Sequence, residues 1–343
     1  MFYNPAMAGD RDLGVAFARA WGSAGPGGRS GWEVTAATGV RGLRLLNEGG
    51  VFDRFLLTEA NPEAAGVLSQ NAARYPGAAV ECRDARVPHD GPTFDYVDVD
   101  PYGTPAPFVP TALAAVRPGG VLAVTATDMM VLAGVQKGAC ERRYGARPVR
   151  GRLGPEGGLR ILLAHVAREA ALRGRSVRPL LCYLRDHHVR AFLEVRIASD
   201  PPPDPVGRID PGSWEGPPLG GNGPYGPLWL GRLFDEELVR ALLVPPNAAR
   251  PSETARFLER LREEAGTDVP FYYESNRLSR ELALSAPPAI GPLLAGLHAQ
   301  GFRAGRTHAR PEGFRTDAPR ATVRGLVRAL SEGAQPQNER VRA

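Results

Sequence analysis

Short apolar runs and helix-like segments alternate along residues 1–198, and this alternation limits the possible folds more than any other feature of the chain. Runs of strand length occur at 31–38, 55–58, 79–82, 94–99, 121–125, 177–184 and 189–197. Helical patterns fall between most of them, at 40–48, 61–75, 108–116 and 159–173. Strands that alternate with helices predict βαβ units and a mostly parallel sheet. We therefore expect an α/β fold with a seven-stranded, Rossmann-like sheet, closed by an antiparallel strand at its edge.

The remainder of the chain predicts a second, smaller domain. Proline and glycine are dense from 199 to 227, which indicates a crossover without regular elements. From 228 to 343, helical patterns occur at 235–243, 252–264, 275–281 and 289–300, and 302–308 with 314–317 predict a two-stranded ribbon. Helices followed by a basic ribbon resemble a winged helix, a shape that binds nucleic acids. We therefore expect a smaller α+β domain of winged-helix-like shape.

Length and composition are those of a globular protein with about two domains. No apolar run approaches the roughly 20 residues that a membrane helix needs, and the N-terminus has no signal-peptide pattern. The three cysteines, Cys82, Cys140 and Cys182, are too far apart in sequence to form a disulfide framework or a C-x-x-C zinc pattern. These features predict a cytoplasmic protein with no membrane partner and no metal.

The basic residues are almost all arginine and are unevenly spread. The net charge is +5, and Lys137 is the only lysine. Codon usage in a GC-rich genome explains this bias, and phosphate recognition by guanidinium groups is the functional alternative. Residues 137–196 contain fourteen basic and five acidic residues, and residues 303–328 contain only two acids among their arginines. Two such stretches indicate a surface for a polyanion, although either one alone also fits a solvated surface.

Three of the expected strands end in loops that suit a nucleoside-like ligand. The loop 37–42 contains Gly39, and its small residues and following helix start allow a ligand to approach backbone N–H groups. Glu59 ends the second strand, where an acid accepts hydrogen bonds from ribose hydroxyls. Asp84, followed by Ala85, ends the third strand and suits a hydrogen bond from an adenine amino group. Each acid alone fits a capping or surface role, but together they predict one binding site.

The loop after the fourth strand predicts the reaction. It contains Asp100, Pro101 and Tyr102 in succession. An exocyclic base amine is a poor nucleophile because its lone pair is delocalised into the ring, and a carboxylate within hydrogen-bond reach counters this and then takes the proton. Proline restricts the loop, and the tyrosine is placed to stack on a base taken out of its helix. The alternative is a plain proline turn beside a core tyrosine.

Several longer strings are specific enough to indicate a family. They are Phe2-Tyr-Asn-Pro5, Ala37-Thr-Gly-Val-Arg-Gly42, Asp98-Val-Asp-Pro-Tyr-Gly-Thr-Pro105, Val124-Thr-Ala-Thr-Asp128, Tyr183-Leu-Arg-Asp-His187, Gly226-Pro-Leu-Trp-Leu-Gly231 and Arg306-Thr-His308. With them the chain resembles, along nearly its whole length, the tRNA (guanine-N2)-dimethyltransferases that modify guanosine 26. The resemblance implies a class I methyltransferase domain at 1–198 that uses S-adenosylmethionine, and a tRNA-binding domain at 228–343.

The resemblance also implies roles for individual residues. Asp100, with Pro101 and Tyr102 beside it, is implied to be the catalytic acceptor next to the guanine amine. The cofactor site is implied for Arg11, Gly39, Arg41, Glu59, Asp84 and Ala85. Contacts to the substrate are implied for Phe2, Tyr3 and Asn4, as part of an N-terminal lid, and for Thr127 and Asp128.

Two departures from the family pattern matter. Many relatives carry four zinc-ligand cysteines between their domains, whereas the corresponding stretch here, about 199–225, has none, so no structural zinc is expected. Glu59 stands where many relatives have aspartate, and either acid can bind ribose hydroxyls. The residues themselves leave open a methyltransferase for an amine on another RNA or DNA base, and a non-catalytic RNA-binding protein of the same fold. One or two methyl transfers are equally open.

Overall fold

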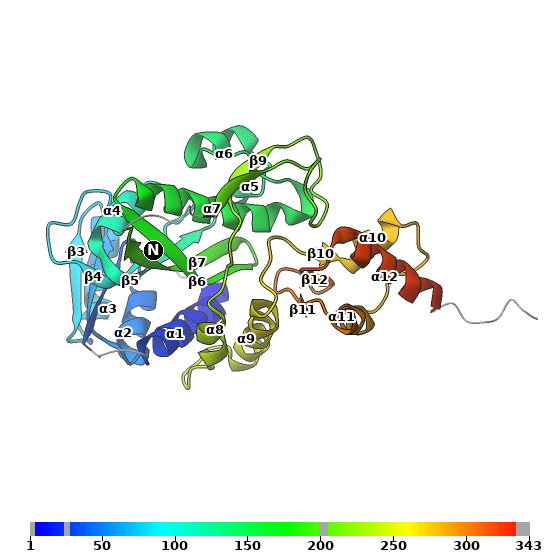
Figure 1. The fold of residues 1–343 in the computed structure, drawn as a ribbon. Coiled ribbons are helices and arrows are strands. Elements are labelled where there is room, and N and C mark those ends of the chain that lie inside the picture. Colours follow the sequence, from blue (N-terminus) through cyan, green and yellow to red (C-terminus); the bar gives the residue numbers. More distant parts are fainter. Residues whose placement is uncertain (1–3, 24–27, 199–204, 334–343) are drawn as a thin grey trace, which may run out of the picture.

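A seven-stranded sheet forms the centre of the larger, N-terminal part of the molecule (Figure 1). The computed structural model describes residues 4–23, 28–198 and 205–333. The strand order is β3-β2-β1-β4-β5-β7-β6, and β7 is antiparallel to both of its neighbours. The strands are β1 Arg29–Glu33, β2 Phe52–Glu59, β3 Ala78–Cys82, β4 Phe94–Val99, β5 Val116–Ala126, β6 Arg175–Arg185 and β7 His188–Ile197. All seven predicted strands and the α/β class are confirmed.

Helices cover both faces of this sheet (Figure 1). One face carries α1 and α2 and the other carries α4 and α7. Among them α1 was not predicted, because its buried first turn is polar. The helices of this part are α1 Ala8–Gly22, α2 Val40–Glu48, α3 Pro62–Ala72, α4 Val109–Ala115, α5 Met129–Leu132, α6 Lys137–Tyr144 and α7 Gly154–Ala171, with short 3₁₀ turns at Pro5–Met7 and Gly151–Leu153.

Local chemistry explains where the helices next to the site begin. Asn61 caps α3 by accepting hydrogen bonds from the N–H groups of Glu63 and Ala64, and Pro62 occupies the first helical position. Gly39 precedes α2 with φ +76°, a conformation that favours glycine. A Cβ atom at Gly39 would lie 2.5 Å from Leu68 Cδ1. Both starts lie at the carboxyl ends of parallel strands, where the loops of the predicted site meet.

Three details of the predicted sheet region are wrong. The first strand ends at Glu33 rather than at 38, because the chain turns into a loop in which Ala37 has φ +47°. The antiparallel strand β7 lies one place inside the sheet, and β6 forms the edge. The stretch 199–227, expected to lack elements, contributes a short antiparallel pair, β8 Val206–Ile209 with β9 Tyr225–Trp229. Proline and glycine at the ends of these two short strands obscure the alternating pattern that would have predicted them.

The C-terminal part is smaller and has its own sheet, of order β10-β12-β11. One hydrophobic core extends from Leu13 to Tyr272, and a second contains residues from Tyr273 to Val327. The expected two-stranded ribbon is part of this three-stranded sheet. The final helix was not predicted. Winged-helix likeness stays a prediction. The elements are α8 Glu236–Ala241, α9 Pro251–Ala265, β10 Tyr273–Glu274, α10 Ser275–Glu281, α11 Ile290–Ala299, β11 Ala304–Arg306, β12 Gly313–Thr316 and α12 Arg320–Gly333.

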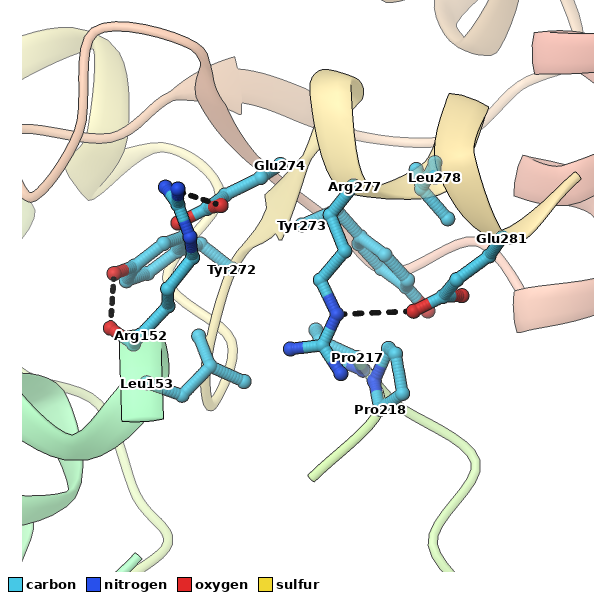
Figure 2. A pocket seen from close by; sticks show the side chains of 10 residues that line it. All are labelled: Arg152, Leu153, Pro217, Pro218, Tyr272, Tyr273, Glu274, Arg277, Leu278 and Glu281. Carbon is cyan, nitrogen blue, oxygen red and sulfur yellow. Dashed lines mark hydrogen bonds and ion pairs between the residues drawn. The ribbon is translucent and has the colours of Figure 1, made fainter. Parts of the chain in front are cut away.

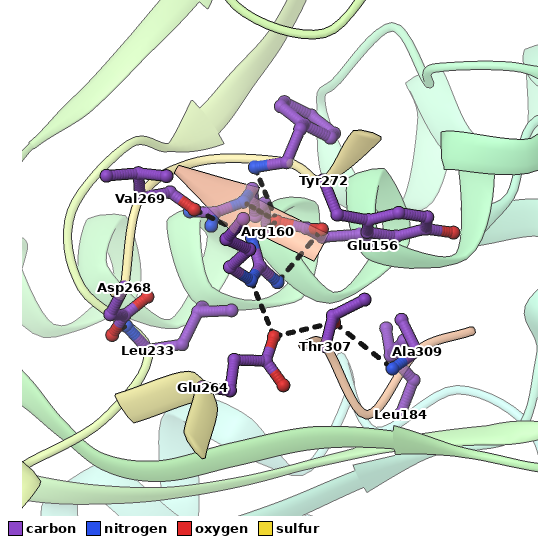
Figure 3. A network of polar contacts seen from close by, with 12 residues as sticks. Glu156, Arg160, Leu184, Leu233, Glu264, Asp268, Val269, Tyr272, Thr307 and Ala309 are labelled. Carbon is purple, nitrogen blue, oxygen red and sulfur yellow. Dashed lines mark hydrogen bonds and ion pairs between the residues drawn. The ribbon is translucent and has the colours of Figure 1, made fainter. Parts of the chain in front are cut away.

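A buried ionic cluster joins the two parts (Figure 3). Arg315 on β12 donates to both carboxylate oxygens of Glu156 on α7, at 3.0 and 3.1 Å, and to Glu264 on α9 at 2.5 Å. Arg160 donates to Glu156 Oε1 at 2.8 Å. All four side chains are fully buried. Two positive and two negative charges balance one another there, as buried charges require.

His308 extends this cluster to the edge of the large sheet. Its Nδ1 lies 2.5 Å from Glu264 Oε2, and its Nε2 accepts a hydrogen bond from the Leu184 N–H at 3.0 Å. A ring nitrogen that accepts a hydrogen bond carries no proton, so this histidine is neutral and donates from Nδ1. A second contact, at the half-exposed Arg152, joins the parts. Arg152 Nη1 lies 3.2 Å from Glu274 Oε2, and Tyr272 donates to the Arg152 carbonyl (Figure 2).

Candidate active site

A cavity of about 1130 Å³ opens at the carboxyl ends of β1, β2 and β4. Gly39 and Asp128 are not among its lining residues, and Phe2 and Tyr3 lie outside the described residues. Each of the four loops that were predicted to form one site contributes at least one lining residue, so these loops meet at the cavity. The predicted site residues that line the cavity are Asn4, Arg11, Arg41, Glu59, Asp84, Ala85, Asp100, Pro101, Tyr102 and Thr127.

Asp100 is held in place by a buried arginine. Arg41 Nη2 donates to Asp100 Oδ2 at 2.6 Å and to Asp10 Oδ2 at 3.1 Å. The Asp100 side chain keeps 22% of its surface exposed, whereas those of Arg41 and Asp10 are almost fully buried. Arg41 therefore anchors Asp100 from behind, while the carboxylate still faces the cavity. The predicted contact of Arg41 with the cofactor stays a prediction, and the structure shows that Arg41 also positions Asp100.

The charges around Asp100 keep it ionised. Burial acts to raise its pKa, but Arg41 and Arg190 outweigh burial, and the pKa of Asp100 is lowered from its ordinary value. Arg190 in turn lies against Asp98, with Nη2 2.6 Å from Oδ2, and Tyr96 donates to the same oxygen at 2.7 Å. Because Arg41 and Arg190 lie close to it, Asp100 is a negatively charged acceptor at neutral pH.

The loop that follows Asp100 is braced by the end of β5. Gly103 N donates to Thr127 Oγ1 at 2.8 Å, and Thr127 N donates to the Gly103 carbonyl at 3.0 Å. Asp128 lies behind this brace and accepts hydrogen bonds from Tyr144, whose hydroxyl also contacts Thr104 at 2.7 Å. Thr127 thus lines the cavity, whereas Asp128 supports the loop from behind. Its substrate contact stays a prediction.

Tyr102 projects from the braced loop into solvent at the mouth of the cavity. Its residue surface is 91% exposed, whereas Pro101 before it is buried. Gly103 after it has φ +87°, so the chain reverses direction at this point. An exposed aromatic ring on a fixed loop is placed to stack on an incoming base.

Glu59 and Asp84 lie on the opposite wall. Glu59 Oε2 accepts a hydrogen bond from Ala37 N at 3.0 Å, and its Oε1 accepts one from Asn61 N at 2.9 Å. Asp84 pairs with Arg86 at 2.6 Å, and the hydrogen bonds from Arg86 lower the pKa of Asp84 to about 2. Both groups are therefore oriented carboxylates that border the cavity.

Two acids of the site were missed from the sequence. Glu33 ends β1 and lines the cavity, where its Oε2 accepts a hydrogen bond from Gly42 N at 2.9 Å. The pattern of acids at strand ends includes it, but an over-long first strand placed it mid-strand. Asp10 belongs to the unpredicted α1, and its Oδ1 also contacts His188 at 3.1 Å. Nothing local in the sequence indicates that Asp10 reaches the site.

Glu33 gives the fold a pH dependence. Burial raises the pKa of Glu33 to about 8, and the nearby Asp98 acts in the same direction. Between the ordinary glutamate pKa of 4.5 and about pH 8, the folded protein keeps a proton on Glu33 that the unfolded chain has released. The stability of the fold therefore falls as the pH rises through this range. We expect Glu33→Gln to be more stable than the wild type, by less at about pH 5.5 than at about pH 8.5. Urea unfolding at both pH values measures this, and a pH-independent difference would contradict it.

No group of three or more histidine, cysteine, aspartate or glutamate side chains within 4–23, 28–198 and 205–333 is arranged to hold a metal ion. No helix in the same ranges has the length and apolar character needed to cross a membrane.

Comparison with known proteins identifies the family. The model of the N2,N2-dimethylguanosine tRNA methyltransferases matches residues 1–200 and 220–328. The chain belongs to this family. Among curated proteins, the tRNA (guanine(26)-N(2))-dimethyltransferases of Thermococcus kodakarensis and Methanospirillum hungatei are 35% and 33% identical to it. The first comparison covers 96% of this chain and 93% of the relative, and the second covers 95% and 91%.

A solved structure also supports the place of the chain among the dimethylguanosine methyltransferases. The complex of Trm1 from Pyrococcus horikoshii with S-adenosyl-L-methionine has a TM-score of 0.83 and 28% identity to this chain, and covers 95% of it and 94% of its own length. The family resemblance indicated by the sequence strings is confirmed, and so is the class I methyltransferase sheet.

Proposed function

We propose that this protein transfers methyl groups from S-adenosylmethionine to the exocyclic N2 of a guanosine in tRNA, at position 26 as its named relatives do. The observation that carries the proposal is Asp100, an ionised carboxylate held by Arg41 on a braced Asp-Pro-Tyr loop at the cavity. We place the reaction in the cytoplasm, since three free cysteines suit a reducing compartment.

The wall formed by Glu59 and Ala85 fits S-adenosylmethionine. The Glu59 carboxylate, fixed by two backbone N–H groups, suits the ribose hydroxyls, and Asp84 suits the adenine amine. Ala85 and Phe108 supply an apolar wall for the adenine ring. When bound, S-adenosylmethionine supplies an electrophilic methyl group. Among the chain's own residues, Arg11 and Asn4 border the same cavity.

In this proposal, Asp100 accepts the hydrogen bond and then the proton of the guanine N2 amine. Arg41 engages Oδ2, and we assign Oδ1 the hydrogen bond from the guanine N2–H. This bond concentrates the lone pair on nitrogen as methylation begins. After methyl transfer the nitrogen is a strongly acidic cation, so even a carboxylate with a lowered pKa accepts its proton. The negative charge of Asp100 also stabilises the positive charge that develops on nitrogen.

Tyr102 is proposed to hold the guanine by stacking. We expect Tyr102→Ala to raise the KM for tRNA about 5- to 100-fold, since stacking on an aromatic side chain contributes about 1–3 kcal/mol per base. Tyr102→Phe keeps the ring and is expected to behave like the wild type. Steady-state methylation with varied tRNA measures the effect, and calorimetry with S-adenosylmethionine checks that the cofactor affinity is unchanged. An alanine variant with the wild-type KM would show that Tyr102 does not contact the base.

Incubation with labelled S-adenosylmethionine and unmodified tRNA tests the proposed reaction. Nucleoside digestion is expected to yield N2-methylguanosine and N2,N2-dimethylguanosine, and their ratio gives the number of transfers. A panel that includes duplex DNA and other RNAs tests the alternative of a different base amine. Label in adenosine or cytidine, or no label in any nucleoside, would contradict the proposal.

A further inference from the structure

A second cavity, of about 540 Å³, lies between the two parts of the molecule. Its walls come from the end of β6, from α9 and from the segment 307–311 before β12. Asp186, in the turn between β6 and β7, lines both this cavity and the candidate active site. The two cavities therefore share the β6–β7 turn as a common wall, so a strand bound in both would cross this turn.

Arg185 is a buried cation with unused hydrogen-bonding capacity at this second cavity. Only 9% of its side chain is exposed, and its Nη1 is buried with no hydrogen-bond partner among the described residues. Its Nη2 pairs with Glu253, and its guanidinium lies 5.2 Å from the centre of the Phe257 ring. A buried donor without a partner is costly unless a ligand satisfies it, and a guanidinium fixed by an aromatic ring is pre-organised for a phosphate.

Three further arginines line the same cavity. Arg256 and Arg260 come from α9, and Arg310 comes from the loop between β11 and β12. Arg256 is exposed and has no ion pair among the residues that the structure describes. The acids of the cavity are Asp186 and Glu253, and Glu253 is already occupied by Arg185. The cavity thus carries four positive side chains against two negative ones.

The two basic stretches of the sequence meet at this place. Arg185 belongs to 137–196, and Arg310 belongs to 303–328. Three other arginines of these stretches, Arg160, Arg190 and Arg315, contribute nothing to the surface charge, because they are fully buried in ion pairs. The arginines of the second cavity lie beside the candidate active site, because the two cavities share Asp186.

We propose that this cavity, with Arg185, Arg256, Arg260 and Arg310, binds backbone phosphates of the tRNA next to the nucleotide that enters the active site. The proposal rests on the proposed function, which makes a tRNA the substrate. Phosphate contacts fix the register of a nucleic acid on a protein. This second cavity, called the groove below, would hold the tRNA strand on one side of the β6–β7 turn, while the guanosine lies in the active site on the other side.

The salt dependence of tRNA binding tests this proposal. Each phosphate contact adds about 0.7–0.9 to the slope of log K against log salt. The double variant Arg256→Gln/Arg310→Gln is expected to lower that slope by about 2 and to weaken binding about ten- to a hundredfold near 0.1 M salt. The matched control is Arg54→Gln/Arg74→Gln, which removes two exposed arginines at the start of β2 and after the end of α3. This control should keep the wild-type slope.

Both groove substitutions lie near the surface, and a thermal unfolding midpoint checks that the variant is folded. If the double variant fails this check, the exposed Arg256→Gln alone should lower the slope by about 1. A groove variant with the wild-type slope and affinity would overturn the proposal. Failure of the proposed function would look different: the wild type would make no methylguanosine. A slope that depends on the groove in a wild type without methylation would support the groove and contradict only the reaction.

Discussion

Replacing Asp100 with alanine is expected to lower kcat for tRNA methylation by about 10²–10⁴-fold, the usual contribution of a positioned general base. The substitution removes both the acceptor of the guanine N2–H and the group that takes its proton. Arg41 keeps its ion pair with Asp10, so the floor of the cavity retains a balanced charge. Single-turnover methylation with saturating tRNA measures the chemical step directly.

Two controls separate chemistry from binding in this variant. The affinity for S-adenosylmethionine, measured by calorimetry, should stay close to that of the wild type, because the proposed contacts to it come from the opposite wall. Asp100→Asn keeps an acceptor oxygen but has no negative charge, and it should fall between alanine and the wild type. An alanine variant that methylates at the wild-type rate would refute the role of Asp100.

Replacing Arg315 with methionine is expected to lower the free energy of unfolding by about 3–5 kcal/mol, as when one partner of a buried ion pair is removed. Glu156 keeps Arg160, but Glu264 loses the only arginine that it contacts among the described residues. Its carboxylate then stays buried with Thr307 and the neutral His308. Urea unfolding, followed by circular dichroism, measures the change.

Arg303→Met is the matched control for this stability prediction. Arg303 pairs with Asp317 at 2.8 Å in the same C-terminal part, but on the surface. Exposed ion pairs contribute about 0–1 kcal/mol, so little loss is expected. An Arg315 variant as stable as this control would show that the buried cluster does not hold the two parts together.

The strands and the catalytic loop were predictable because their signals are local. The run that forms β4 is apolar or buried throughout and ends at Asp100-Pro101, and Asn61-Pro62 marks the start of α3 by capping chemistry alone. The fold class and the four loops of the site follow from such signals and from the rule that the carboxyl ends of parallel strands meet.

The parts that were not predictable depend on contacts between distant segments. Asp12 in α1 is fully buried, and its carboxylate accepts hydrogen bonds from the N–H groups of Ala249 and Arg250. A polar first turn of this kind has no amphipathic pattern, so α1 was missed. The arginine count misleads for the same reason: Arg190 and Arg315 look like surface charge in a sequence, and only the fold shows that they are buried.

A single atom of the substrate gives the most direct test of the central claim, that the protein methylates the exocyclic N2 of guanosine. Two tRNA transcripts are compared, one with guanosine at position 26 and one with inosine, which lacks only the N2 amino group. Both should compete for binding, since phosphate contacts are unchanged. The account predicts methyl transfer at position 26 of the guanosine transcript and none at that position of the inosine transcript. Equal methylation of inosine 26 would contradict it.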